Sequence, residues 1–468
     1  MSDEIKIDLL MDEAFSPEGS KKSNLKDVLK NYSFLLMQFG YFIEILGSSS
    51  VVIALMFLIY STSQSPALIG LFQTVTMIPA VVLAPFAGVL VDRMDQRKIM
   101  MLSMLVRVVT AIGLALVYIF RNKLIFSVAL NIVNPGESGN GELQNNSLFL
   151  ALLFIIFILR VSIWPFFNPA KGAYTKLIVE EKNLLTANSF ASTTSQIAGV
   201  LGPIISGVLV AIGYTIGFIF AIGTSSLAFI IFIFLSIFGR KPPSKNNETN
   251  HIKTKSRTVE AINELKIGMK TIRQEPKILY LILLLGIVSF TVAGIDVMWP
   301  VILQGEMNLN STWYGAMESV VSACAIIASL VIMIVGKIDR KVVMMTSLLA
   351  LEGTIIILMG YIRLPWVMIF AVMVPYGIVY GIFGITLETI IQEKVDYEKQ
   401  GRVFSAQSFL SSLTLLIGLV IVTSIAEFVQ PSIVLYVCGS LELLTVLGGF
   451  IFIWRKKLFT TDYVKIKN

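Results

Sequence analysis

The 468-residue chain is poor in the residue types from which many enzyme and metal sites are built. It has a single histidine, His251, and its two cysteines, Cys324 and Cys438, both lie inside apolar blocks. Metal sites made of His and Cys clusters are therefore excluded, and a disulfide framework is not expected. A Gly-x-x-x-x-Gly-Lys-Ser/Thr loop is absent as well, so this chain carries no ATP-driven pump of that kind. The sequence predicts a protein that is not an enzyme and that holds no cofactor and no metal.

The sequence is also poor in charged residues. Only 14% of the residues are charged and 55% are hydrophobic, whereas soluble domains carry about 25% charged residues. The apolar residues form blocks of roughly 20, the length that crosses a ~30 Å hydrocarbon core at 1.5 Å per helical residue. The sequence therefore predicts an all-α polytopic protein of the cell membrane with twelve transmembrane helices. We expect them near 33–60, 67–91, 98–120, 147–168, 184–211, 215–238, 277–300, 313–336, 342–362, 364–387, 403–428 and 431–454.

Lysine and arginine are unevenly distributed between the predicted loops. With the N-terminus inside, the four short cytosolic loops hold twelve basic residues and the exterior side holds three. Because basic residues are retained on the cytosolic side, both termini are expected to be cytosolic. This asymmetry also explains the net charge of +7 without a nucleic-acid partner. Residues 1–32 are too polar for a signal peptide and are expected to form a cytosolic tail.

The two halves of the chain resemble each other. Residues 187–190 match residues 406–409, and at the same offset Gly199 falls on Gly418. An internal repeat of this kind predicts a 6+6 pseudo-symmetric arrangement. We expect bundles at 33–238 and 277–454, a cytosolic linker at 239–276 and a C-terminal tail at 455–468. Linker residues 258–274 carry apolar side chains on one helical face, which favours an amphipathic helix on the inner membrane surface.

A cluster of acidic and basic residues, in the stretch GVLVDRMDQRKIMML, separates the second and third predicted spans. Gly88, Asp92, Arg93 and Arg97 resemble the Gly-x-x-x-Asp-Arg-x-Gly-Arg-Arg/Lys signature of the major facilitator superfamily, with Asp and Gln at two of the later positions. The resemblance implies a cytosolic gate, in which Asp92 faces the start of the eleventh helix and the arginines pair with acids across the seam. The alternative is that these charges only keep the hairpin out of lipid. Asp339 and Arg340, in a degenerate second copy, and Glu388 are assigned to the same gate.

A second motif, GVLGPIISG, lies in the fifth predicted span. It is similar to the Gly-x-x-x-Gly-Pro-x-x-Gly-Gly motif of drug:proton antiporters, with Val208 in place of the last glycine. Together with FFNPAKGAYTKLI and LLTANSF it resembles the macrolide-efflux and siderophore-export branch, which implies export. The alternative is that Gly and Pro are simply common in membrane helices. The motif residues are Gly199, Gly202, Pro203 and Gly207, which permit close helix contact and a bend.

Charges inside the predicted spans cost about 2.5–3.5 kcal/mol each and mark functional sites. Glu44, on a small-residue face of the first span, and Arg160, in the fourth, form the best candidate pair. In the family these spans line the central cavity, so a carboxylate that binds either a proton or a cationic substrate would give exchange. The alternative is a static salt bridge.

Three further residues are assigned to the cavity. Gln196 belongs to a polar stripe on the fifth span, and Asp296 and Glu318 are expected to line the cavity of the second half, with solvation at its rim as the alternative. The remaining charges lie on helices that are peripheral in this fold and are assigned to structural pairing or snorkelling. They are Arg107, Glu352 and Glu442.

These observations predict a secondary active transporter that exports amphipathic or hydrophobic small molecules in exchange for protons, by alternating access around a midplane site. Its expected partners are a small-molecule substrate, protons and the lipid bilayer, and it is expected to be a monomer. One alternative is a dedicated transporter of one metabolite, siderophore or lipid. An alternative of another class is a non-transporting membrane receptor or scaffold, which would not need a buried titratable pair.

Overall fold

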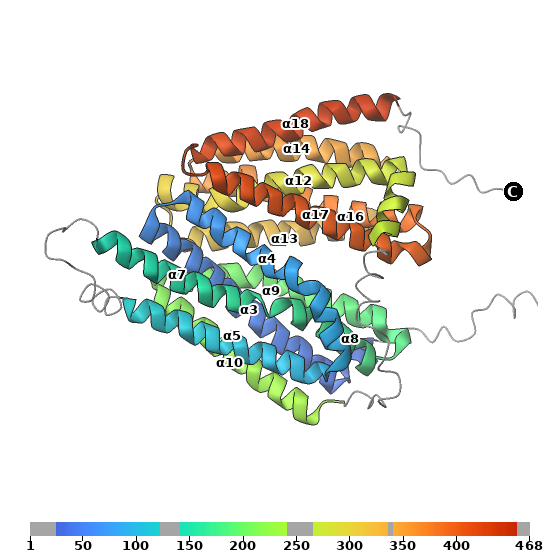
Figure 1. Ribbon diagram of the computed structural model, residues 1–468. Helices are drawn as coiled ribbons and strands as arrows, with labels where there is room; N and C mark the ends of the chain where they lie inside the picture. The colour runs from blue at the N-terminus through green and yellow to red at the C-terminus, as the bar shows by residue number, and fades with distance from the viewer. Residues whose placement is uncertain (1–24, 122–140, 241–264, 336–339, 456–468) are drawn as a thin grey trace, which may run out of the picture.

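The computed structural model describes residues 25–121, 141–240, 265–335 and 340–455 (Figure 1). Within these ranges the chain is helical and contains no strand. Eleven of the described helical segments are long and apolar enough to cross a membrane, and the apolar start of a twelfth, Pro66–Pro79, belongs to a helix of 28 residues. The predicted all-α membrane fold is confirmed.

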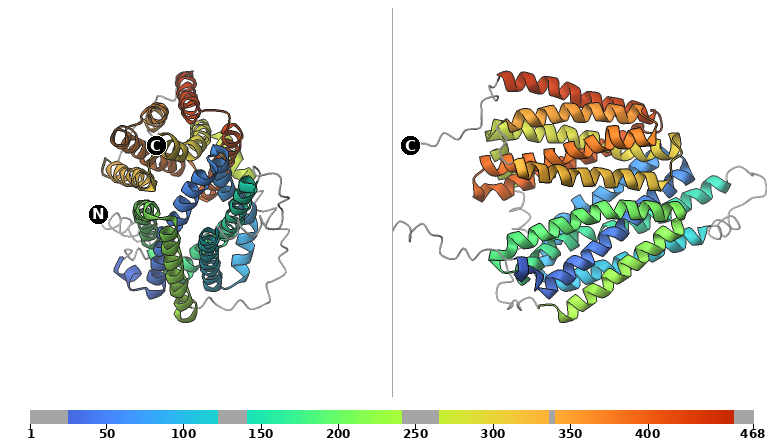
Figure 2. Two further views of the ribbon diagram at one scale, coloured as in Figure 1. Left: turned by 90° about the vertical axis from the view of Figure 1, so that its left-hand side faces the viewer. Right: turned by 180° about the vertical axis from the view of Figure 1, so that it is seen from behind.

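The helices form two sets that lie beside each other (Figures 1 and 2). The first set contains α3 (Tyr32–Ser63), α4 (Pro66–Arg93), α5 (Gln96–Ile119), α7 (Gly141–Val161), α8 (Trp164–Ile178), α9 (Leu184–Ile212) and α10 (Tyr214–Phe238). The second contains α12 (Pro276–Val301), α13 (Ser311–Val335), α14 (Lys341–Tyr361), α15 (Pro365–Met368), α16 (Val374–Lys394), α17 (Tyr397–Ile425) and α18 (Pro431–Arg455). A short α2 (Leu25–Leu29) precedes the first set.

The main helix pairs that join the sets are α9 with α13 and α4 with α17, and α4 also contacts α12. We call the end at which α3 begins the inner end, and the opposite end, at which α3 ends, the outer end, following the predicted orientation. Among the described residues, five side-chain hydrogen bonds connect the sets in the outer half: Ser65 to Glu427, Gln73 to the Asp296 carbonyl, Gln304 to the Phe57 carbonyl, Ser311 to the Gly207 carbonyl and Ser319 to the Val200 carbonyl. The sets therefore meet closely at the outer end.

Helix starts follow from local capping chemistry. The side chains of Asn31, Ser65 and Asp95 accept hydrogen bonds from the first-turn amides of α3, α4 and α5. These amides have no partner inside their own helix, so a side-chain acceptor fixes the starting residue.

The fourth span differs from its predicted bounds. Helix α7 ends at Val161, and α8 begins at Trp164 with Pro165 in its first turn, where a missing N–H costs nothing. Helix α8 then continues to Ile178 through residues that we had predicted to be a loop. The physical reason is burial, because Phe167, Tyr174 and Ile178 all pack into the core of the first set.

The linker helix is described only from residue 265, and residues 265–274 are helical. Its apolar side chains Met269 and Ile272 pack into a core of the second set. A Cβ atom on Gly268 would touch the Arg402 carbonyl, so this segment lies directly against α17. This part of the apolar face is thus turned toward the protein, and its contact with the inner membrane surface stays a prediction.

Candidate functional site

A fully buried ionic network lies inside the first set. Glu44 Oε1 accepts hydrogen bonds from Arg107 Nη1 at 2.5 Å, Arg160 Nη2 at 3.1 Å and Ser48 Oγ at 3.1 Å. Arg160 Nη1 also donates to the Arg107 carbonyl at 2.7 Å. Within the described residues Glu44 Oε2 has no hydrogen-bond partner. Two guanidiniums therefore share one carboxylate oxygen, and the Ser225 side chain also faces this carboxylate.

Small residues on α3 explain why Glu44 is so deeply buried. A Cβ atom on Gly40 would lie 2.9 Å from a Phe232 ring carbon, and one on Gly47 would meet the Thr224 side chain. The predicted small-residue face of α3 is thus covered by α10. Glu44 is completely shielded from solvent, so a ligand does not reach it in this conformation.

Aromatic rings and cations form a layer on the inner side of this network. Tyr41 stacks with both Trp164 and Phe167, at ring-centroid distances of 5.9 and 5.8 Å. The Arg107 guanidinium lies 4.6 Å from the Trp164 ring centroid, and Lys171 Nζ lies 3.5 Å from that of Tyr41. Cation–π contacts of this kind hold a charge near a desolvated region at low cost.

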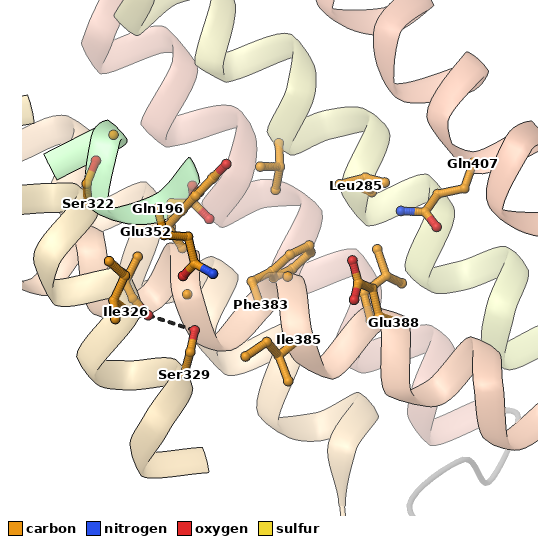
Figure 3. Close-up of a pocket in the computed structure, with 17 residues that line it drawn as sticks. Gln196, Leu285, Ser322, Ile326, Ser329, Glu352, Phe383, Ile385, Glu388 and Gln407 are labelled. Atoms are coloured by element: carbon orange, nitrogen blue, oxygen red, sulfur yellow. Dashed lines mark hydrogen bonds between the residues drawn. The ribbon is translucent and has the colours of Figure 1, made fainter. Parts of the chain in front are cut away.

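Two cavities lie between α9 and the second set. One has a volume of about 480 Å³ and the other about 630 Å³. Gln196 lines both cavities, and Gly199 lines the smaller one. In the view of Figure 3, Gln196 and Glu352 lie toward one end of the smaller cavity, and Glu388 and Gln407 lie toward the other.

The two acids that were assigned to the cavity of the second half are not among the described residues that line these two cavities. Asp296 and Glu318 are partly buried near Tyr314, and neither lines the two cavities. Gln73 of the first set donates to the Asp296 carbonyl at 3.3 Å. These acids therefore lie beside the outer seam.

Three charged residues that we had assigned to structural pairing or snorkelling make defined contacts in the structure. Arg107 makes the shortest contact to Glu44, and Glu352 forms part of a cavity wall although it lies on α14. Glu442 on α18 accepts a hydrogen bond from Thr291. The sequence does not predict these contacts, because the partner of each side chain depends on which helices pack against each other.

The structure describes only part of the charged residues that were assigned to the cytosolic gate. Gly88, Asp92 and Arg93 belong to α4, but their side chains lie outside the described part, as does the whole of Asp339. Arg340 is exposed at the start of α14. The gate function of these residues stays a prediction.

Arg97 contacts its own hairpin and α10. Its Nε and Nη2 donate to the Asp95 carboxylate at 3.1 and 2.7 Å, and Nη1 donates to the Gly239 carbonyl at 2.9 Å. We had predicted a partner across the seam, but Asp95 is nearer and the end of α10 offers a free carbonyl. Burial alone would raise the pKa of the Asp95 carboxyl, but the hydrogen bonds and charge of Arg97 outweigh burial and hold that pKa below its usual value.

The GVLGPIISG motif forms close helix crossings. A Cβ atom on Gly202 would lie 2.6 Å from Ser49 Oγ of α3. One on Gly207 would lie 2.5 Å from the Ser311 carbonyl oxygen and 3.1 Å from Gly315 Cα, both of α13. One on Gly315 would meet the Pro203 carbonyl. Glycines on both helices therefore allow the two sets to meet backbone to backbone at the outer end.

Comparisons with known proteins agree with this architecture. The family described as Major Facilitator Superfamily matches residues 37–419. Macrolide efflux protein A of Streptococcus pyogenes is 22% identical over 389 residues, which cover 83% of this chain and 88% of that protein. Macrolide efflux protein A of Enterococcus faecalis is 23% identical over 343 residues, 73% of this chain and 96% of that protein. The crystal structure of a bacterial homologue of the iron transporter ferroportin, in an inward-facing state, superposes with a TM-score of 0.64 at 12% identity, covering 90% of this chain and 98% of that one.

Proposed function

The chain belongs to the major facilitator superfamily, and from this premise we propose that it exports amphipathic or hydrophobic small molecules in exchange for protons. Membership supports a multi-pass membrane transporter of small molecules that is not an enzyme. The similarity to macrolide efflux proteins favours drug-type export over import. We further propose that it works as a monomer in the cell membrane with both termini in the cytosol.

The observation that carries the proposal is the contrast between the two ends of the seam. At the outer end α9 and α13 cross through Gly207 and Gly315, whose Cα region leaves no space for a side chain. Toward the inner end the same two helices line a cavity of about 630 Å³. Cavities of roughly 300–1,000 Å³ suit drug-sized molecules. A closed outer seam above an open cavity is the arrangement that alternating access requires on its inward side.

The buried network of Glu44, Arg107 and Arg160 supports the proton as coupling ion. A proton on Oε2 of Glu44 would neutralise the carboxylate and weaken its hold on both guanidiniums. The helices that carry the arginines, α5 and α7, would then be free to shift against α3. In this proposal Glu44 binds the proton, its contact with Arg160 weakens as a result, and Gln196 contacts the substrate.

The test is efflux from a bacterial host that lacks its own pumps. Cells expressing the protein would be loaded with a panel of macrolides, lipophilic dyes and siderophores, with and without an uncoupler. We expect uncoupler-sensitive export of several unrelated compounds. Export of one compound alone would favour a dedicated exporter. No export from well-expressed protein would refute the proposal.

A variant of the outer seam makes the test specific to alternating access. Gly207→Ala would place a methyl group against the Ser311 carbonyl. Overpacking costs about 1–3 kcal/mol, and a change of that size lowers the equilibrium constant for outer closure by roughly 5- to 150-fold. Gly223→Ala on α10 is the matched control, because its methyl group would enter open space. We expect export to fall in the first variant and to remain in the second.

A further inference from the structure

The side chain of one lysine reaches deep into the first set and lies above an aromatic ring. Lys171 is in the middle of α8, and its Nζ lies 3.5 Å from the centroid of the Tyr41 ring. Tyr41 comes nine residues after the first residue of α3, which is about 13.5 Å along the helix axis. Glu44 follows less than one turn later. The ammonium group therefore lies close to the level of the Glu44 network.

This position does not fit a lysine that only marks the inner side of the membrane. Such a lysine extends its ammonium group toward the lipid headgroups. Lys171 belongs to the residues that we had predicted to be a cytosolic loop, but α8 continues through them and the side chain lies over Tyr41. Lys176 on the same helix is exposed, as an anchoring lysine should be.

Lys171 also lacks an acid that would balance its charge. Among the described residues it has no hydrogen-bond or ion-pair partner. The acid of the neighbouring network, Glu44, is already shared by Arg107 and Arg160. Three cations therefore stand against one acid in this part of the first set. A cation–π contact offsets part of the cost of such an unpaired charge and leaves the rest uncompensated.

The helix face that carries Lys171 is partly open. Lys171 itself is half-buried, and Asn168 and Gly172 beside it are exposed. Among the described residues, a Cβ atom on Gly172 would enter open space. The ammonium group is thus accessible to a molecule that approaches along α8.

Helix α9 connects this place with the smaller cavity, of about 480 Å³. The side chain of Ser195 on α9 faces the Tyr41 hydroxyl group. Gly199 lies four residues after Ser195, on the same face of the helix, and it lines the smaller cavity. Lys171 and Tyr41 therefore lie beside the α9 wall of that cavity.

The two sides of the cavity differ in charge. The acids in its lining, Glu352 and Glu388, belong to α14 and α16 of the second set, whereas Lys171 belongs to the first set. An anionic group is repelled by the acids and attracted by the lysine, so it is directed to the first set. A lysine ammonium group has three N–H donors, and the ring contact leaves donors available for an oxyanion.

We propose that Lys171, held over the Tyr41 ring, binds the anionic group of an amphipathic substrate, which is a carboxylate or a similar oxyanion. The ammonium group supplies the charge and the N–H donors, and the ring fixes its position. The apolar body of the substrate lies in the cavity between the sets. The inference deepens the proposed function and rests on it for transport, whereas binding of the anion is a property of the site itself.

The experiment compares two probes that share a dansyl body. Dansylglycine is an anion at pH 7, and dansylamide is neutral. Binding to the purified full-length chain in nonionic detergent is measured by equilibrium dialysis, with protein-free micelles as the blank. We expect the wild type to bind dansylglycine about tenfold more tightly than dansylamide, because a hydrogen bond to a charged group has at least that effect.

Three variants assign this preference to one side chain. Lys171→Gln removes the charge and keeps a polar side chain, so it should weaken dansylglycine binding about tenfold and leave dansylamide binding unchanged. Lys171→Arg keeps the charge and should retain most of the preference. Lys176→Gln changes an exposed lysine of the same helix, so it is the matched control and should behave like the wild type.

A lysine that only braces α8 against α3 would give a different result. In that case Lys171→Gln would lower the thermal unfolding midpoint and weaken the binding of both probes alike. We expect its midpoint to stay at or above that of the wild type, because the substitution removes an unpaired charge. A lowered midpoint, equal binding of the two probes by the wild type, or a preference that survives in Lys171→Gln would each overturn the proposal.

Failure of this site and failure of the proposed function give distinguishable results. Selective binding of dansylglycine without efflux of any compound from cells would refute the proposed function and leave the site intact. Efflux of neutral compounds by a protein that does not prefer dansylglycine would refute the site and leave the proposed export intact.

Discussion

Removing the single carboxylate from the buried network of the first set should be far more harmful than removing either of its arginines. Glu44 faces the guanidiniums of Arg107 and Arg160. With all three groups charged, two positive charges stand against one negative charge. Glu44→Gln leaves two buried guanidiniums that face each other without a counter-charge, whereas Arg107→Gln leaves one balanced pair.

The magnitudes follow from this count. Breaking a buried ion pair by removing one partner costs about 3–5 kcal/mol, because an uncompensated charge remains. Arg107→Gln loses hydrogen bonds of a charged group but leaves no uncompensated charge, which costs about 1.5–3 kcal/mol. We therefore expect Glu44→Gln to be less stable than Arg107→Gln. The double variant, which carries both substitutions, should be more stable than Glu44→Gln alone.

The assay is thermal unfolding of each purified variant in detergent, followed by tryptophan fluorescence. An unfolding midpoint of Glu44→Gln at or above that of Arg107→Gln would refute the reasoning. Additive effects in the double variant would refute it as well, because residues in one ionic network must couple. Transport by Glu44→Gln is informative only once its folded fraction is known.

Three further changes test other parts of the fold. Ser319→Ala removes a 2.7 Å hydrogen bond to a carbonyl of α9, so it should weaken outer closure by about 0.5–1.5 kcal/mol and raise the labelling rate of cysteines placed in the outer seam. Gly268→Leu should lift segment 265–274 off α17 and speed proteolysis of the linker. Asp95→Asn should lower the unfolding midpoint at pH 7. Since the folded-state pKa of Asp95 is below its usual value, this difference should hold above about pH 4 and disappear as the pH falls further.

The sequence was sufficient for the architecture because span length and hydropathy depend on the bilayer alone. Predicted helix bounds such as 184–211 agree with α9 to within a residue. The fourth span differed most, since its continuation past Pro169 depends on burial of Tyr174 and Ile178 against other helices. Such tertiary burial leaves no length signal in the sequence.

The candidate site was predicted in part. Glu44 and Arg160 were paired from their depth in the spans, and the structure places their charged atoms 3.1 Å apart. Periodicity shows which face of a helix is polar, but it does not show which helix covers that face. For this reason Arg107 and Glu352, on helices that were taken as peripheral, could not be assigned to a network or a cavity.

The interruption between α7 and α8 has an electrostatic consequence. Arg160 lies in the last turn of α7, where the unpaired carbonyl groups of a helix end carry about half a negative charge. The uncompensated positive charge of the Glu44 network is thus placed beside a backbone counter-charge that a continuous helix would not offer. A count of acidic and basic side chains overstates the imbalance of this site, because part of its neutralisation is supplied by the peptide backbone at the helix break.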